Sequence, residues 1–197
     1  NGFSPVGPAY GAYHLAKAPV PDPAKAKQLL ADAGYAEGLR ITLVAQNQLD
    51  VIPIATVWKE QLAQVGVTAD IQVVPTDVYY GDGETGWLNC DFGITDWGSR
   101  ATPVTYFKLA YMSDGPWNGS HWQDAEFDEL AHQVDRELDP AKRAELYHKL
   151  QQILIDRGPV IVPYFEKAVV GVSARLEEVA LASDWARTRF WHGYFAP

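Results

Sequence analysis

The feature that most constrains the fold is a strand–helix–strand pattern over residues 39–74. Residues 39–46 have a sequence typical of a strand, and residues 67–74 alternate apolar and polar side chains as a half-buried strand does. Between them, apolar residues at helical spacing predict a helix over about 53–65, which Gly66 closes. A helix that connects two strands of one sheet implies a parallel pair. The sequence therefore predicts an α/β fold.

Other helices are indicated by acidic capping residues, by Pro in the first turn and by Gly at the end. They are expected over residues 22–34, 103–111, 127–138 and 139–158. Apolar stretches rich in β-branched residues predict strands over 160–165 and 168–172, and residues 91–97 are a further candidate strand. This alternation predicts a sheet flanked by helices.

Composition excludes several classes of function. The 197 residues suit one domain with a substantial core or at most two small domains, and the net charge of −9 argues against a nucleic-acid binder. A single cysteine, Cys90, permits neither an internal disulfide nor a cysteine-based metal site. The sequence contains no run of about eighteen apolar residues, so no membrane span is predicted. The opening Asn1-Gly2, with no Met and no signal sequence, is expected of a processed or excised chain.

Six segments resemble, in the same order, the dipeptide/oligopeptide-type (family 5) extracytoplasmic solute-binding proteins of ABC importers. They are residues 22–35 (DPAKAKQLLADAGY), 61–67, 91–103, 118–130, 139–147 and 159–164. The segment Trp97-Gly98-Ser99-Arg100 looks closer to the branch that binds opines and sugar derivatives than to the oligopeptide binders. The resemblance covers most of residues 20–166 and only the second, C-terminal lobe of that family.

The resemblance implies a periplasmic-binding-protein-like lobe with a mixed sheet flanked by helices. Residues 1–21 would be an extended segment after the hinge, 22–175 the solute-binding lobe, and 176–197 an aromatic tail packed on it. The expected partners are a small solute (a peptide or opine-like compound), the missing first lobe and the membrane subunits of an importer, with no nucleic acid. The expected location is periplasmic or extracytoplasmic in a bacterium, and no cofactor is expected.

The first group of candidate ligand-binding residues follows the candidate strand 91–97. These residues are Asp96, Trp97, Gly98, Ser99 and Arg100. Ligands bind at the carboxyl edge of open α/β sheets, where Trp97 would offer a flat apolar surface and Arg100 a fork of donors for a carboxylate. The alternative is that Trp97 belongs to the core and Arg100 pairs on the surface with Asp96 or Asp91.

A second group lies in the loop 117–122, which combines two indoles, an amide, a hydroxyl and an imidazole. Trp117, Asn118 and His121 are the candidates, because such a mixture suits the orientation of a small polar ligand. The alternative is a structured loop whose Asn and Ser side chains bond its own backbone.

Catalytic motifs give no support for an enzyme. Residues 81–86 fit G-x-G-x-x-G, but no strand leads directly into them and no long apolar helix follows, so a dinucleotide site is rejected. There is no H-E-x-x-H sequence and no G-x-S-x-G elbow, and no metal site is expected. The alternative function is a small α/β hydrolase that assembles carboxylate and His residues in space, such as Asp96 and His121.

Overall fold

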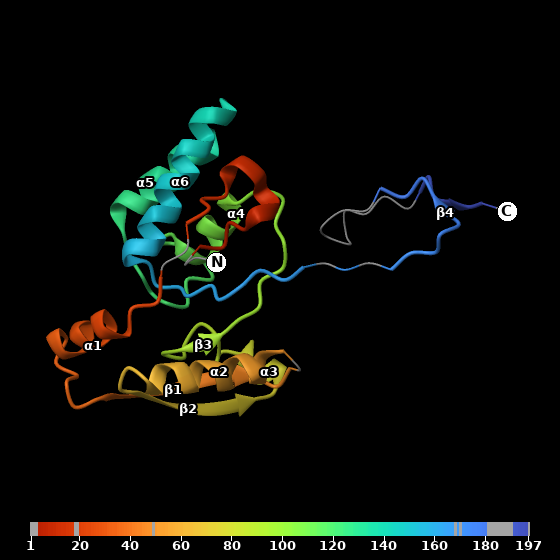
Figure 1. Ribbon diagram of the computed structural model, residues 1–197. Helices are drawn as coiled ribbons and strands as arrows, with labels where there is room; N and C mark the ends of the chain where they lie inside the picture. The colour runs from red at the N-terminus through yellow and green to blue at the C-terminus, as the bar shows by residue number, and fades with distance from the viewer. Residues whose placement is uncertain are drawn as a thin grey trace.

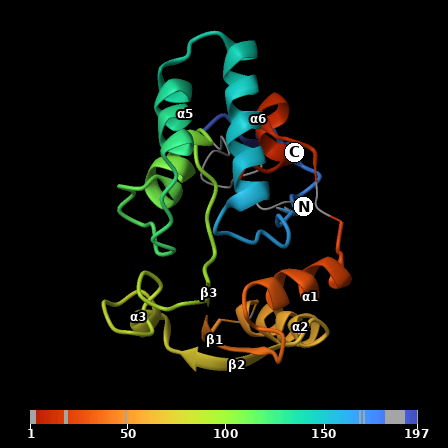
Figure 2. The same ribbon diagram turned by 90° about the vertical axis from the view of Figure 1, so that its left-hand side faces the viewer.

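The computed structural model describes residues 4–17, 20–48, 50–167, 169, 171–180 and 191–196. Two halves are visible in both views of the ribbon (Figures 1 and 2). One half holds a parallel sheet with short and medium helices, and the other is built from helices. The chain crosses between the halves after the sheet's third strand, so the segment that leaves this strand lies at their junction.

The strand–helix–strand unit forms as predicted. β1 (Leu39–Gln46) and β2 (Val67–Val74) pair in parallel from Leu39↔Val67 to Gln46↔Val74, and α2 (Val51–Ala63) connects them. On the other side of β1, β3 (Gly93–Ile94) pairs in parallel with Val44 and Ala45. The sheet order is β2-β1-β3. The α/β fold class is confirmed, but among the described residues this sheet is purely parallel rather than mixed, and the candidate strand 91–97 shortens to two residues.

The two faces of the sheet have separate cores. One face lies against α2, where Leu43 and Ala45 of β1 and Ala55 of α2 have no exposed surface. The other face lies against the short helix α3 (Thr76–Tyr79), and Tyr79 is fully buried there against Val44. Because successive strand residues point to opposite faces, adjacent apolar residues of β1 supply both cores.

α1 (Pro23–Asp32) begins and ends at the predicted signals. The Asp22 side chain accepts a hydrogen bond of 2.9 Å from the backbone N–H of Lys25, and Gly34 follows the helix at φ 90°. Its apolar stripe, however, is not buried, because Leu29 remains 58% exposed. The capping signals are local and act without a packing partner, whereas burial of the stripe needs a surface that the described residues do not place against it.

The second half is a helical core. α4 (Val104–Tyr106) runs into the π-helical turn η2 (Phe107–Tyr111), and α5 (Ala125–Arg136) lies beside α6 (Pro140–Arg157). Their shared core includes the fully buried side chains of Phe107, Phe127 and Leu150. The helix predicted over 127–138 ends two residues early, at Arg136, because the chain is already extended at Glu137, and Leu138 is 85% exposed.

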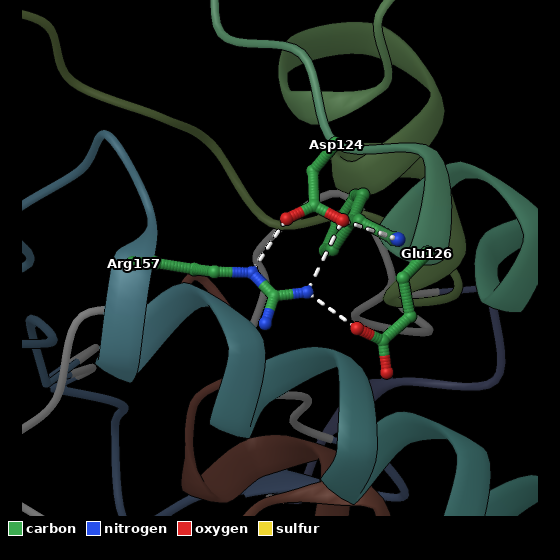
Figure 3. A network of polar contacts seen from close by, with 4 residues as sticks. Asp124, Glu126 and Arg157 are labelled. Carbon is green, nitrogen blue, oxygen red and sulfur yellow. Dashed lines mark hydrogen bonds and ion pairs between the residues drawn. The ribbon is translucent and has the colours of Figure 1, made fainter.

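An ion-pair network fastens the end of α6 to the start of α5 (Figure 3). The Arg157 guanidinium lies 2.6 Å from Asp124 Oδ2 through Nε and 2.5 Å from Glu126 Oε2 through Nη2. Asp124 also caps α5 through the backbone N–H of Phe127. These hydrogen bonds with Arg157, and secondarily with the backbone, lower the pKa of the Asp124 carboxyl below its usual value. The acidic residues at this helix start thus have a structural role.

The N-terminal segment lies across α6. Part of the segment 1–21, expected to be extended, forms the 3₁₀ helix η1 (Pro8–Tyr13), which Pro8 helps to start. The side chain of Gln151 on α6 is 1% exposed and binds both Leu15 N and Tyr13 O, at 3.0 and 2.7 Å. These bonds hold η1 against the helical core. The division of the chain into three parts remains a prediction.

The C-terminal part departs most from expectation. Residues 160–165, predicted as a strand, belong to no strand, and the predicted strand 168–172 has no assigned strand at its described positions, residues 168 and 170 lying outside them. β4 (Leu176–Glu177) and β5 (Tyr194–Phe195) pair antiparallel, and they stand away from the helices rather than packing on them (Figure 1). An apolar β-branched run becomes a strand only where a partner edge is within reach, and none of the described residues offers one beside it.

Within the described parts of the chain, no helix has both the length and the apolar character needed to cross a membrane.

Candidate ligand site at the carboxyl edge of the sheet

The site is built from the residues that follow β1 and β3 at the edge where both strands end. Gln46, the last residue of β1, is fully buried although it is polar. Its Nε2 donates a hydrogen bond of 2.9 Å to Asp96 Oδ1, and its Oε1 accepts one of 2.9 Å from Gln48 Nε2. A buried amide of this kind is retained only where its hydrogen bonds are made. Gln46 therefore fixes the carboxylate of Asp96 at the sheet edge.

Tyr80 supplies a second donor to the same carboxylate oxygen. Its hydroxyl lies 3.0 Å from Asp96 Oδ1, and burial raises the pKa of Tyr80 although the hydrogen bond from Gln46 opposes the shift. The phenol thus stays protonated and donates. Asp96 itself is exposed and forms no ion pair with a described residue. Neutral groups alone orient this anion.

Three tryptophans meet beside Asp96 and form what we call the indole cluster, Trp87, Trp97 and Trp117. Their ring centroids lie 5.7 to 6.5 Å apart, at interplanar angles of 56° to 61°. Such tilted contacts are favourable aromatic geometry. Trp87 packs against the sheet core and Trp97 against the helical core, so the cluster joins the two halves. Trp97 is therefore part of the packing, as the alternative interpretation required, while Trp117 stays 37% exposed.

Arg100 folds back over its own loop. Its Nη1 donates to the carbonyl oxygens of Gly98 and Ser99 at 3.1 and 3.3 Å, and its guanidinium carbon lies 5.5 Å from the centroid of the Trp97 ring. The expected alternative partners, Asp96 and Asp91, form no salt bridge with it in the described structure. Arg100 is half-buried, and a cation held over an indole face is attracted to it.

The loop 117–122 reaches the site through Trp117 alone. Asn118 Nδ2 donates to the carbonyls of Met112 and Trp122, and Asn118 Oδ1 accepts from Ser120, so this amide stabilises its own loop. The geometry favours the structural interpretation of Asn118. His121 is exposed at φ 53°, and its imidazole makes no hydrogen bond to the described residues. Its assignment as a ligand residue stays a prediction.

Groups suited to catalysis are not assembled in the described part of the chain. No group of three or more His, Cys, Asp or Glu residues that could hold a metal ion occurs there. Burial raises the pKa of the Cys90 thiol, so it is a poor nucleophile. Asp96 and His121, the pair that a hydrolase would need, share no hydrogen bond. A groove of about 480 Å³ lies between α5 and α6 and is lined by charges of both signs, such as Glu129 and Lys149.

Three residues of the candidate site were not predicted from the sequence. Gln46 and Tyr80 gave no signal beyond their positions, at the end of a strand and just after a short helix. Trp87 follows the G-x-G-x-x-G stretch, which was rejected for other reasons. All three could have been suspected from one rule, that polar and aromatic residues following parallel strands gather at one edge.

A parallel sheet with a polar and aromatic edge, continued into a second half at the same edge, defines the class as an open α/β fold of the kind that binds ligands at that edge. The family described as bacterial extracellular solute-binding proteins, family 5 (middle region), matches residues 1–119, and the chain belongs to this family.

Known relatives agree with this assignment. Di/tripeptide-binding protein 1 of Pseudomonas aeruginosa (strain UCBPP-PA14) is 35% identical over 147 residues, which are 71% of this chain and 27% of that protein. The periplasmic binding protein DppA from Helicobacter pylori, solved with the peptide STSA, is 26% identical with a TM-score of 0.70 over 80% of this chain and 32% of its own. MoaA from A. tumefacien R10, solved with mannopinic acid, is 26% identical with a TM-score of 0.58 over 68% and 28%. The chain thus spans 27% to 32% of the length of these relatives.

Proposed function

We propose that this chain is the ligand-binding lobe of an ABC-importer solute-binding protein that captures a small zwitterionic solute, either a di- or tripeptide or an opine-like compound. The observation that carries the proposal is the pair of opposite charges on one loop, Asp96 and Arg100, beside the indole cluster. Each charge is oriented by neutral groups and keeps one edge free. A solute with an ammonium and a carboxylate group matches this arrangement.

Asp96 is the proposed contact for the ammonium group. Both of its hydrogen bonds, from Gln46 and Tyr80, reach Oδ1. Oδ2 has no hydrogen-bond donor among the described residues, and the side chain is exposed. A ligand ammonium at Oδ2 would form a charge-assisted hydrogen bond, which is stronger than one between neutral groups.

Arg100 is the proposed contact for the carboxylate. Its Nη1 is occupied by the carbonyls of Gly98 and Ser99, whereas Nε and Nη2 make no hydrogen bond within the described structure. These two nitrogens form the edge of the guanidinium that binds a carboxylate in a bidentate manner. The cation–π contact with Trp97 would keep this edge in place.

The remaining contacts would come from the rest of a longer protein. Trapping between two lobes by hinge closure, with delivery to importer membrane subunits outside the cytoplasm, is the function that membership of this family supports. The relatives described above include a di/tripeptide-binding protein and a protein solved with mannopinic acid, so both solute classes belong to the proposal. The protein would not be an enzyme.

Titration of the protein with L-alanyl-L-alanine and with mannopinic acid tests the proposal. N-acetylation of the dipeptide should weaken binding to the wild type but not to Asp96→Asn, and C-terminal amidation should weaken binding to the wild type but not to Arg100→Met. Each lost charge-assisted hydrogen bond corresponds to roughly tenfold to hundredfold in affinity. Asp91→Asn, an exposed carboxylate on the same segment, is the matched control and should change nothing.

Two results would contradict the proposal. One is equal weakening of free and acetylated dipeptide by Asp96→Asn, since Asp96 would then act only on the fold. The other is a dissociation constant below about 1 µM for this chain alone, which corresponds to about −8 kcal/mol and leaves no role for a second lobe. Turnover in a broad hydrolase screen, abolished by Asp96→Asn, would instead favour the enzyme.

A further inference from the structure

Tyr10, far from the ligand loop in sequence, holds the backbone of Arg100. Its hydroxyl donates to the carbonyl oxygen of Arg100 at 2.8 Å and accepts from the backbone N–H of the same residue at 3.2 Å. One side chain thus binds both backbone polar groups of one residue. A pair of bonds of this kind restricts rotation of the Arg100 peptide units on both sides.

A second tyrosine completes the arrangement. The Tyr106 hydroxyl donates to Gly98 O at 3.0 Å, and the two phenol oxygens lie 3.3 Å apart. Each hydroxyl has one proton, and each has a carbonyl of the loop as its acceptor. The two hydroxyl protons are therefore donated to two different carbonyl oxygens. Burial raises the pKa of Tyr106, so its hydroxyl keeps this proton. The Tyr10 and Tyr106 rings meet edge to face at 6.3 Å.

Tyr10 can act in this way because η1 is itself fixed. Gln151 binds the backbone at Tyr13 and Leu15, and His148 Nε2 lies 3.0 Å from the carbonyl oxygen of Ala12. The position of Tyr10 is thus set by α6 of the helical core. Through Tyr10, the N-terminal segment and α6 set the backbone conformation of the loop that carries Asp96 and Arg100.

We propose that Tyr10 is a positioning residue for the solute: by binding Arg100 N and Arg100 O, it aims the free Nε–Nη2 edge of that guanidinium at the ligand carboxylate. The inference rests on the proposed function of Arg100. It adds a residue of the N-terminal segment that does not itself touch the solute.

The test compares Tyr10→Phe with Tyr13→Phe. Tyr10→Phe removes the hydroxyl and keeps the ring against Tyr106. Tyr13→Phe removes a hydroxyl from the same turn that makes no hydrogen bond to the described residues, and its ring still packs on Tyr147 at 4.8 Å. Without ligand, the backbone amide of Arg100, followed by NMR hydrogen exchange, should exchange roughly threefold to tenfold faster in Tyr10→Phe alone.

Ligand binding then separates positioning from general stability. L-alanyl-L-alanine should bind roughly threefold to tenfold more weakly to Tyr10→Phe than to the wild type, with Tyr13→Phe unchanged. The loss should vanish for the C-amidated dipeptide and in the Arg100→Met background, because Tyr10 acts through Arg100. Unchanged Arg100 exchange, or the same loss in both backgrounds, overturns the inference. If the wild type binds neither the dipeptide nor mannopinic acid, the proposed function fails, and the exchange of Arg100 still decides whether Tyr10 holds the loop.

Discussion

Replacement of Gln151 by Met should destabilise the protein by about 2 kcal/mol. The Gln151 amide is 1% exposed and makes three hydrogen bonds, to Leu15 N at 3.0 Å, Tyr13 O at 2.7 Å and Tyr147 O at 2.9 Å. Tyr147 O lies in the ladder of α6 and keeps its helical partner. The other two groups belong to the N-terminal segment and would lose theirs.

The magnitude follows from those two groups. A part-buried backbone donor or acceptor left without its partner costs about 1 kcal/mol or more, and Met fills a volume similar to that of Gln, so no large cavity adds to the cost. A loss of about 2 kcal/mol is a change of about thirtyfold in the folding equilibrium constant. It would lower the urea midpoint by about 1 M.

Urea unfolding of Gln151→Met and Gln152→Met makes the comparison. Gln152 is the next residue of the same helix, and its exposed bonds to Lys17 and Asp156 should contribute less than about 0.5 kcal/mol. Equal destabilisation by both variants would refute the reasoning, since a general effect on the helix would then be the cause. So would a Gln151→Met variant as stable as the wild type, which would mean that the hydrogen bonds of Gln151 to the N-terminal segment contribute nothing to stability.

Two other predictions concern pH and backbone conformation. Because Arg157 holds the folded-state pKa of Asp124 below the reference value of 3.8, this pair contributes stability above pH 3.8 that is lost as the pH falls through the lower folded-state pKa. Arg157→Met should therefore destabilise the protein more at pH 7 than at pH 2.5 in urea unfolding, and an equal effect at both would contradict the pair. Gly66→Ala should lower the free energy of unfolding by about 1 kcal/mol, measured by thermal unfolding, because Gly66 lies at φ 91°. Gly83→Ala should lower it little, because Gly83 has free space around it and no positive φ. The reverse order of the two effects would contradict this assignment.

Local signals were the part of the fold that the sequence could predict. Asp22 and Asp139 cap the helices that follow them, and Gly158 directly follows α6. These helix ends were predictable because each of the three residues acts on backbone groups only a few residues away. The parallel pair of β1 and β2 was predictable for a related reason, since one short helix connects the two strands. Features that depend on distant partners were not predictable. The stretch 160–165 has strand composition, but no partner edge from the described part of the chain lies beside it.

The position of the candidate site in the fold was predictable from the sequence, but the contacts of its residues were not. The segment from Asp96 to Arg100 does follow a strand at the carboxyl edge, as the resemblance implied. The role of each residue, however, depends on groups from elsewhere in the chain. Gln46 and Tyr80 hold Asp96, and Tyr10 reaches Arg100 across 90 positions of sequence. A hydrogen bond between such distant residues leaves no periodicity in the sequence, and so only the folded structure could show it.

The indole cluster also gives the protein an optical property. With ring centroids 5.7 to 6.5 Å apart, the ultraviolet transition dipoles of Trp87, Trp97 and Trp117 are coupled. Coupled transitions give a paired positive and negative circular dichroism band that a lone indole lacks. Since Trp87 belongs to the sheet half and Trp97 to the helical half, the amplitude of this band measures the relative orientation of the halves. The circular dichroism of the indole cluster thus reports on the junction where the proposed ligand would bind.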